Sequence, residues 1–191
     1  MLHPSLIGAR ACVFDAGGTL VALNQASAAV IDLLHLPVKN TLAGLSADAF
    51  NCPGAILKVA TGDPLRPVLA GSPAETYVMF ERGPAFEPQP GFRGSILASY
   101  AKDASPLASG YVLHPELLSG KAAALEVSYG SGHIFLFGFK PQWRAQSHGT
   151  YKLLFSTLYQ FEKLPPYPEP LKPPPADSAK PAPHENPVAE H

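Results

Sequence analysis

Cysteine is scarce in this chain of 191 residues, which contains only Cys12 and Cys52. Two cysteines do not make the dense disulfide network on which small secreted domains depend, and the apolar content here is high enough for a core without one. A bridge between Cys12 and Cys52 is one alternative. Two buried free thiols are the expected state, because a free cysteine packs like a small apolar side chain.

Charge of one sign and long apolar runs are also missing. The 14 Lys and Arg side chains against 15 Asp and Glu leave a net charge of −1, and no basic run would follow a phosphate backbone. No stretch of about 18 apolar residues exists to span a membrane. Residues 1–6 also lack the charged and long apolar regions of a secretion signal. We therefore expect no nucleic acid and no membrane as partners, and no export signal in this chain.

Proline is abundant, with 22 residues, and it is concentrated after Lys163. Because proline fixes φ and removes a hydrogen-bond donor, the sequence predicts a disordered Pro-rich tail at 164–191, and deletion from Pro165 onward should not change the melting temperature. A ligand for a proline-recognising partner is the alternative function of this tail. With 46% hydrophobic residues, the part at 16–163 is predicted to be one α/β domain, and 1–15 remain unassigned.

The apolar pattern predicts the elements of this domain. Strands are expected at 19–23, 55–60, 76–80 and 96–101, with a short helical turn at 64–69. A helix at 26–34 should turn one side inward, formed by Ala29, Val30, Leu33 and Leu34. Strands at 122–128 and 133–139 form a hairpin, because the Tyr129-Gly130-Ser131-Gly132 link supplies positive φ.

A closing helix is predicted at about 150–161. Its apolar face consists of Tyr151, Leu154, Phe155, Leu158 and Phe161. Strands and helices in this order predict an α/β fold in which a mixed sheet carries flanking helices.

The segment from Gly120 to Phe155 reads GKAAALEVSYGSGHIFLFGFKPQWRAQSHGTYKLLF. This segment resembles the C-terminal region of bacterial zinc carboxypeptidase-type metallopeptidases, relatives of carboxypeptidase A, in which a domain like the class I glutamine amidotransferases follows the peptidase domain. Residues 17–24, 36–40 and 52–54 are similar to earlier parts of that domain. The resemblance implies an amidotransferase-like (flavodoxin-like) fold that is present only in part, as an N-terminally truncated fragment.

The resemblance also implies a partner, a cofactor and a location. The partner would be the missing peptidase domain of the parent chain, and zinc would belong to that catalytic domain rather than to this chain. The parent would hydrolyse C-terminal or cell-wall-type peptides in a secreted or periplasmic setting.

The catalytic motifs of three enzyme classes are incomplete in this sequence. A zinc carboxypeptidase needs H-x-x-E, whereas His114-Pro115-Glu116 has the wrong spacing. An amidotransferase needs a cysteine at a strand-to-helix elbow, but Cys52 precedes a proline that has no N–H for an oxyanion. Asp15 begins a phosphatase-like pattern in which Gly17 replaces the second aspartate. We therefore expect no peptidase, glutaminase or phosphatase activity from this chain alone, and name no catalytic or metal-binding residue.

The loop after the hairpin holds the candidate ligand-binding residues, Gln142, Arg144, Gln146 and His148. If the loop is extended, Arg144, Gln146 and His148 point to one side and Trp143 to the other. An arginine beside an amide and an imidazole suits a carboxylate or a sugar hydroxyl. The structural alternative, which we favour, is that Arg144 holds backbone carbonyls at a strand end.

Two functions follow from these observations. The first is a non-catalytic accessory domain, or fragment, of a zinc carboxypeptidase-type metallopeptidase. The second is a free-standing small-ligand binding module that uses the Arg144 loop.

Overall fold

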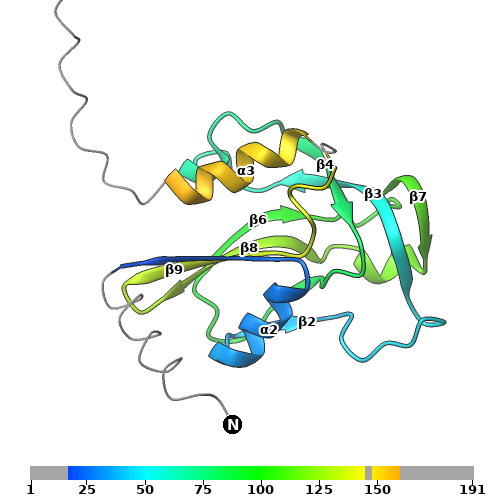
Figure 1. Ribbon diagram of the computed structural model, residues 1–191, viewed down its shortest axis with the longest axis horizontal. Helices are drawn as coiled ribbons and strands as arrows, with labels where there is room; N and C mark the ends of the chain where they lie inside the picture. The colour runs from blue at the N-terminus through cyan, green and yellow to red at the C-terminus, as the bar shows by residue number, and fades with distance from the viewer. Residues whose placement is uncertain (1–16, 145–147, 160–191) are drawn as a thin grey trace, which may run out of the picture.

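The computed structural model of the protein describes residues 17–144 and 148–159. The assignments of 1–15 and 164–191, together with Cys12, Gln146 and Phe161, lie outside these residues. Within the described ranges, one curled mixed sheet carries an α-helix on each face (Figure 1).

The bounds of the elements are as follows. The strands are β1 (Thr19–Leu23), β2 (Val38–Asn40), β3 (Asn51–Thr61), β4 (Glu75–Phe80), β5 (Phe86–Pro88), β6 (Gly94–Ser99), β7 (Leu107–Leu113), β8 (Ala122–Tyr129) and β9 (Gly132–Phe137). The α-helices are α2 (Gln25–Leu34) and α3 (His148–Tyr159), and the short 3-10 helices are η1 (Pro67–Leu69) and η2 (Pro115–Leu118).

The sheet has the order β1-β9-β8-β6-β3-β4, with β7 on β3 and with β5 joining β2 to β8. The described parallel pair is β1 with β9, and the other pairings are antiparallel, so the predicted mixed sheet is confirmed. The hairpin is also confirmed: Tyr129 pairs with Gly132, and Gly130 takes the positive φ of 59° that the tight turn requires.

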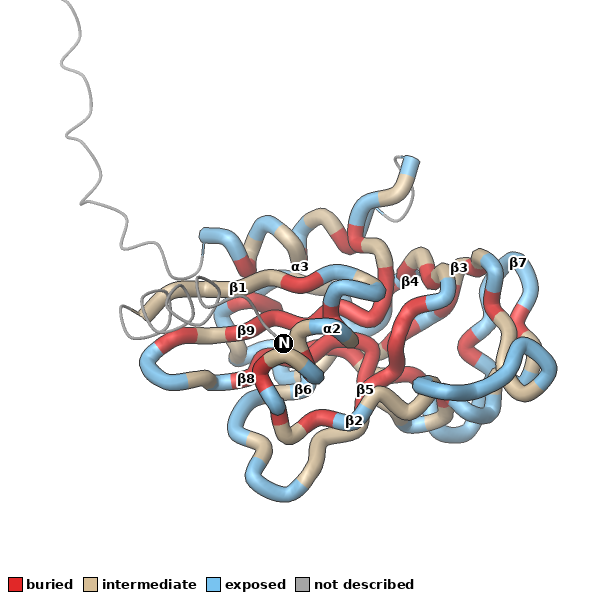
Figure 2. Tube along the Cα trace, turned by 60° about the horizontal axis from the view of Figure 1, so that its bottom comes forward, coloured by how far each residue is buried: buried red, intermediate tan, exposed pale blue. Residues whose placement is uncertain are grey.

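The core lies on both faces of the sheet, and β9 shows why. Phe135 and Phe137 enter the cluster beneath α3, whereas Ile134 and Leu136 enter the cluster that α2 covers. A strand that is buried on both faces has a nearly continuous apolar sequence instead of an alternating one. Figure 2 shows this buried layer running through β8 and β9.

Helix α2 confirms the predicted helix, but its inward face is rotated. The buried residues are Ser27, Ile31 and Leu34, and Ala29 is exposed. The Ser27 hydroxyl lies 2.9 Å from the carbonyl oxygens of both Ala22 and Phe137. This contact ties the first turn of α2 to the ends of β1 and β9, and it requires a small polar side chain rather than a large apolar one.

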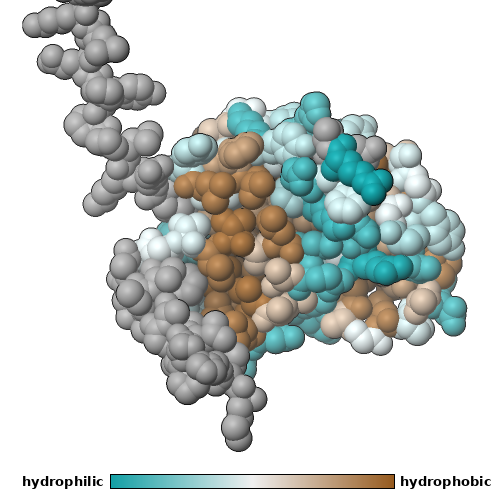
Figure 3. Space-filling view, in the orientation of Figure 1, coloured by the Kyte–Doolittle hydropathy of each residue, from teal (hydrophilic) through white to brown (hydrophobic). Residues whose placement is uncertain are grey.

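Helix α3 lies where a helix was predicted, yet its apolar face points away from the sheet. The buried residues are Thr150, Leu153 and Thr157, whereas Phe155 and Leu158 are 52% and 53% exposed. Small residues let α3 approach β4 closely. At Gly149 there is no room for a side chain, because an added Cβ would lie 2.7 Å from Thr76 Oγ1. Figure 3 shows an apolar band that runs from the C-terminal part of α3 over the neighbouring strand β1.

The other predicted strands are confirmed with shifted ends, since 55–60 is part of the longer β3 and 96–101 begins earlier as β6. The helical turn is the 3-10 helix η1. The sequence patterns missed the short strands β2 and β5, and also β7. In the part of the chain that the structure describes, no helix is long and apolar enough to cross a membrane.

Candidate functional site

The loop after β9 is fastened to the end of β4 through Lys140. Its backbone N–H donates to Met79 O at 2.9 Å, and its ammonium group binds the Glu81 carboxylate. The same ammonium lies 3.8 Å from the centre of the Trp143 ring, a cation–π geometry. The loop is therefore positioned by Lys140, Glu81 and Trp143, of which the sequence analysis had considered only Trp143.

Arg144, the central candidate, is exposed and lies 5.3 Å from the Trp143 ring centre. Among the described residues its guanidinium makes no hydrogen bond to a backbone carbonyl, so the anchoring role that we favoured from the sequence finds no support. Its φ of 46° lies in the left-handed region, and the backbone is therefore not a simple extended run.

The other candidates do not converge with Arg144 on one side. His148 opens α3 and stacks on Tyr151, with ring centres 5.6 Å apart. Gln142 is exposed, and Gln146 lies outside the described residues. The expected alternation of Arg144 and His148 fails because His148 is helical, and alternation requires a strand.

Cys52 lies near the start of β3, and its thiol is 3.8 Å from Phe80 O. It is a buried free thiol, as expected from the sequence. Burial raises the pKa of Cys52 to about 11. A nucleophilic cysteine needs a lowered pKa and a strand-to-helix elbow, so this environment suits a packed thiol rather than a catalyst.

His114 and Glu116, which lack metal-ligand spacing, bind each other at the surface. The two groups are 2.8 Å apart, and hydrogen bonds from the Glu116 backbone N–H and from His114 lower the pKa of Glu116. Within the described ranges, no cluster of three or more His, Cys, Asp or Glu side chains has metal-binding geometry.

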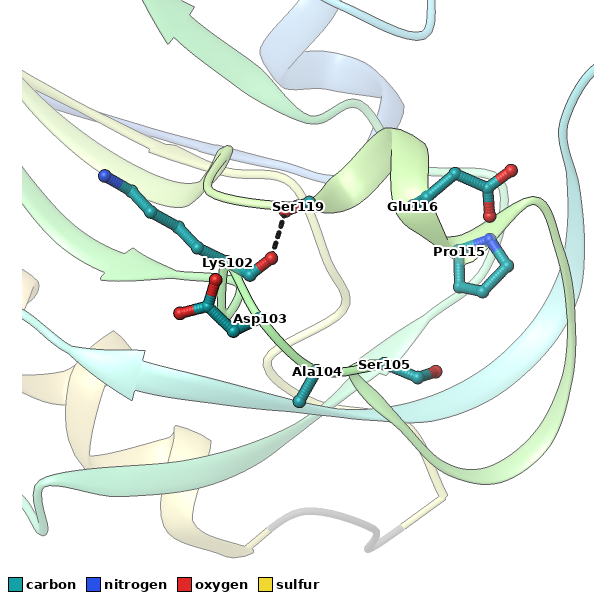
Figure 4. Close-up of a pocket in the computed structure, with 7 residues that line it drawn as sticks. All are labelled: Lys102, Asp103, Ala104, Ser105, Pro115, Glu116 and Ser119. Carbon is teal, nitrogen blue, oxygen red and sulfur yellow. Dashed lines mark hydrogen bonds between the residues drawn. The ribbon is translucent and has the colours of Figure 1, made fainter.

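A cavity of about 280 Å³ lies next to Glu116 (Figure 4). Its lining residues are Lys102, Asp103, Ala104, Ser105, Pro115, Glu116 and Ser119. The charged ends of Lys102 and Glu116 point in different directions, and the Ser119 hydroxyl is bonded to Lys102 O at 2.6 Å. Catalysis needs polar groups that meet at one point, and this cavity does not provide them.

The carboxyl ends of β1 and β9 form the edge at which open α/β sheets commonly bind ligands. In this protein, backbone segments that follow β1, β4 and β9 pack against one another at that edge. Asn24 N–H donates to Phe137 O at 2.8 Å, and the Asn24 side-chain amide donates to Glu81 O at 3.1 Å. A Cβ on Gly83 would lie 1.9 Å from Gly138 O, so two glycines let these segments touch.

An ionic cluster around one buried carboxylate lies beneath α3 and was not predicted from the sequence. Glu126 on β8 is 2% exposed and is bound by Arg66, which comes from the segment before η1. His133 Nδ1 on β9 lies 3.1 Å from the other oxygen of Glu126. One glutamate in an otherwise apolar strand was the available signal, whereas nothing in the sequence indicated that Arg66, 60 positions away, would pair with it.

No known family profile matches this chain, and no curated protein matches its sequence. The solved structures to which it is similar include two ThuA-like proteins. One is a ThuA-like protein from Parabacteroides merdae ATCC 43184, with TM-score 0.50 and 14% identity over 83% of this chain and 66% of that one. The other is a ThuA-like protein from Bacteroides uniformis ATCC 8492, with TM-score 0.47 and 12% identity over 82% and 63%. The chain spans less than two thirds of the length of either.

At this identity the first likeness shows the fold alone. The protein has an α/β, class I glutamine amidotransferase-like fold, with a mixed sheet and flanking helices, as the sequence predicted. Many unrelated functions share one fold, so the function has to be argued from the residues.

Proposed function

We propose that this chain is a non-catalytic accessory domain of a zinc carboxypeptidase-type metallopeptidase, whose parent hydrolyses peptides. The observation that carries the proposal is the environment of Cys52: a neutral, buried thiol inside a strand, in a fold whose enzymes require an exposed nucleophile at an elbow. The fold is then used as a scaffold and not for amide hydrolysis.

The positions of the motif residues support the same proposal. Within the segment that resembles the metallopeptidase family, Phe137 and Phe139 pack in the core, and Thr150 Oγ1 donates to Pro141 O at 2.6 Å. Lys140 binds Glu81. These contacts set the path of the chain from β9 into α3. The motif residues therefore maintain a local backbone structure against which a neighbouring domain can pack.

The experiment has two parts. The isolated chain should hydrolyse neither glutamine nor a C-terminal peptide substrate, with or without added zinc. It should form a complex, detected by size-exclusion chromatography, with the catalytic domain of a carboxypeptidase A-like enzyme supplied as a separate chain. Peptide hydrolysis that a zinc chelator abolishes would overturn the non-catalytic assignment, and failure to form this complex would overturn the accessory role.

The second candidate is a small-ligand binding module that uses the Arg144 loop with Gln142, Gln146 and His148. The observation that favours it is the exposed guanidinium of Arg144, which has no carbonyl partner among the described residues. Arginine in this state is available for a carboxylate or phosphate. This function requires thermal stabilisation by such an anion in the parent chain and its loss in Arg144→Ala.

A further inference from the structure

A second arginine, Arg82, borders a cavity that is separate from the one next to Glu116. The cavity measures about 250 Å³ and is formed by the loop between β2 and β3, the start of β3, and the turn after β4. Its lining residues are Leu42, Leu45, Ala47, Phe50, Asn51, Cys52, Arg82 and Gly83. Arg82 is the one charged residue among these eight.

The backbone of Arg82 is fixed, although its side chain is exposed. Its N–H donates to Cys52 O at 3.0 Å, and its carbonyl accepts from the Gln25 amide. Its φ of 50° is left-handed, a conformation that costs a non-glycine residue about 1 kcal/mol and that these two bonds maintain. The side chain of Arg82 therefore leaves the turn in a defined direction.

The guanidinium of Arg82 has no ion pair or hydrogen bond among the described residues. The adjacent carboxylate, Glu81, is already bound by Lys140. The carboxamide of Asn51 likewise makes no side-chain hydrogen bond there. Two donor groups that have no partner within 17–144 and 148–159 thus border one cavity.

The apolar wall of the cavity is built in advance of any ligand. Leu42 N–H donates to the Asn40 side chain at 3.1 Å, and Phe50 N–H donates to Ser46 O at 3.0 Å. The Phe50 ring packs edge-on against Phe80, with ring centres 6.2 Å apart, and both Leu42 and Phe50 rest on the main core. These contacts hold the wall without help from an occupant.

We propose that this cavity binds a small monocarboxylate that carries an apolar group. The carboxylate would lie on the Arg82 guanidinium and the Asn51 amide, and the apolar group would contact Leu42, Leu45 and Phe50. A planar guanidinium binds a carboxylate through two parallel hydrogen bonds. The volume is smaller than the roughly 300–1,000 Å³ of pockets for drug-sized ligands, which limits the occupant to a small acid.

The test is an NMR titration of the whole chain with four probes: phenylacetate, acetate, 2-phenylethanol and inorganic phosphate. Phenylacetate should shift the amide signals of Asn51, Arg82 and Gly83 in a saturable way. Acetate lacks the apolar group and 2-phenylethanol lacks the charge, so each should bind at least about tenfold more weakly. Phosphate binding as tight as that of phenylacetate would overturn the assignment to a carboxylate.

Variants test the role of Arg82 itself. Arg82→Gln should weaken phenylacetate binding by about tenfold or more, because a hydrogen bond between two charged groups is lost. Arg93→Gln, which changes an exposed arginine elsewhere, should bind as the parent does. Equal binding by Arg82→Gln and the parent, or loss of binding in Arg93→Gln, would refute the site.

A substitution in the wall tests the site independently of Arg82. Leu45 is 41% exposed, so Leu45→Ala should fold normally. This variant should bind phenylacetate more weakly and acetate unchanged, because the apolar contact alone is removed. An unchanged affinity for phenylacetate would contradict the proposed placement.

Discussion

Glu126 on β8 and His133 on β9 lie diagonally across the hairpin, with Oε1 and Nδ1 3.1 Å apart. They share one face of the sheet, since Glu126 is opposite Phe135 and His133 is opposite Ser128. The second oxygen of Glu126 binds Arg66. A nearly fully buried carboxylate therefore joins two strands to the segment that leads into η1.

We expect Glu126→Gln to lower the free energy of unfolding by about 2 kcal/mol, because it removes a buried charge that hydrogen-bonds to an arginine. Urea unfolding at neutral pH measures this loss. Glu75→Gln is the matched control, since Glu75 pairs with Lys58 at 2.8 Å but its side chain is 59% exposed. The control should change stability by less than about 0.5 kcal/mol, and equal losses in the two variants would contradict the role given to burial.

The two sides of α3 should respond differently to truncation. Leu153→Ala removes a side chain that is 1% exposed and should cost roughly 2–4 kcal/mol. Leu158→Ala makes the same change on a side chain that is 53% exposed and should cost less than about 1 kcal/mol. Chemical unfolding of both variants checks the orientation of the helix. A larger loss at Leu158 would mean that the sequence-predicted face is the packed one.

The thiol of Cys52 should be protected in the native protein. Burial raises its pKa from 9.0 to about 11, so the thiolate that reacts with disulfide reagents is scarce at about pH 8. Because the pKa of Cys52 is higher in the folded protein than in the unfolded chain, the stability of the folded protein falls as the thiol ionises. The contribution of the neutral thiol to the free energy of unfolding is complete below pH 9.0 and is lost as the pH rises through about 11. In a Cys12→Ser background, labelling should be slow in buffer and fast in denaturant. Fast labelling of the folded chain would show that Cys52 is accessible.

Arg144→Ala should leave stability nearly unchanged, with a loss below about 1 kcal/mol. The described contact of Arg144 is a cation–π approach to Trp143 at 5.3 Å on an exposed surface. A thermal melt of the variant beside Lys140→Met gives the comparison, because Lys140 contacts both Glu81 and Trp143 and should cost more. A loss of several kcal/mol in Arg144→Ala would restore the anchoring role that the sequence had favoured.

The sequence by itself determined the elements whose apolar pattern matches one regular period. β1, β4, the β8–β9 hairpin and both α-helices lie where they were predicted, because strand and helix periods differ and glycine marks the turn between Tyr129 and Gly132. The resemblance to the metallopeptidase domain supplied the amidotransferase-like fold. The short strands β2 and β5 were missed, since three residues are too few to show a period.

The tertiary structure decided which face of each helix is buried and which polar groups meet. Ser27 and the threonines of α3 can be buried because backbone carbonyl oxygens accept hydrogen bonds from their hydroxyl groups. Small polar residues therefore stand, in place of apolar ones, where the helices lie closest to the sheet. Arg66 binds Glu126, and Arg82 borders one cavity with the loop before β3, across separations in sequence that carry no local signal. Periodicity reports the local conformation of a chain, whereas these contacts depend on how distant segments pack.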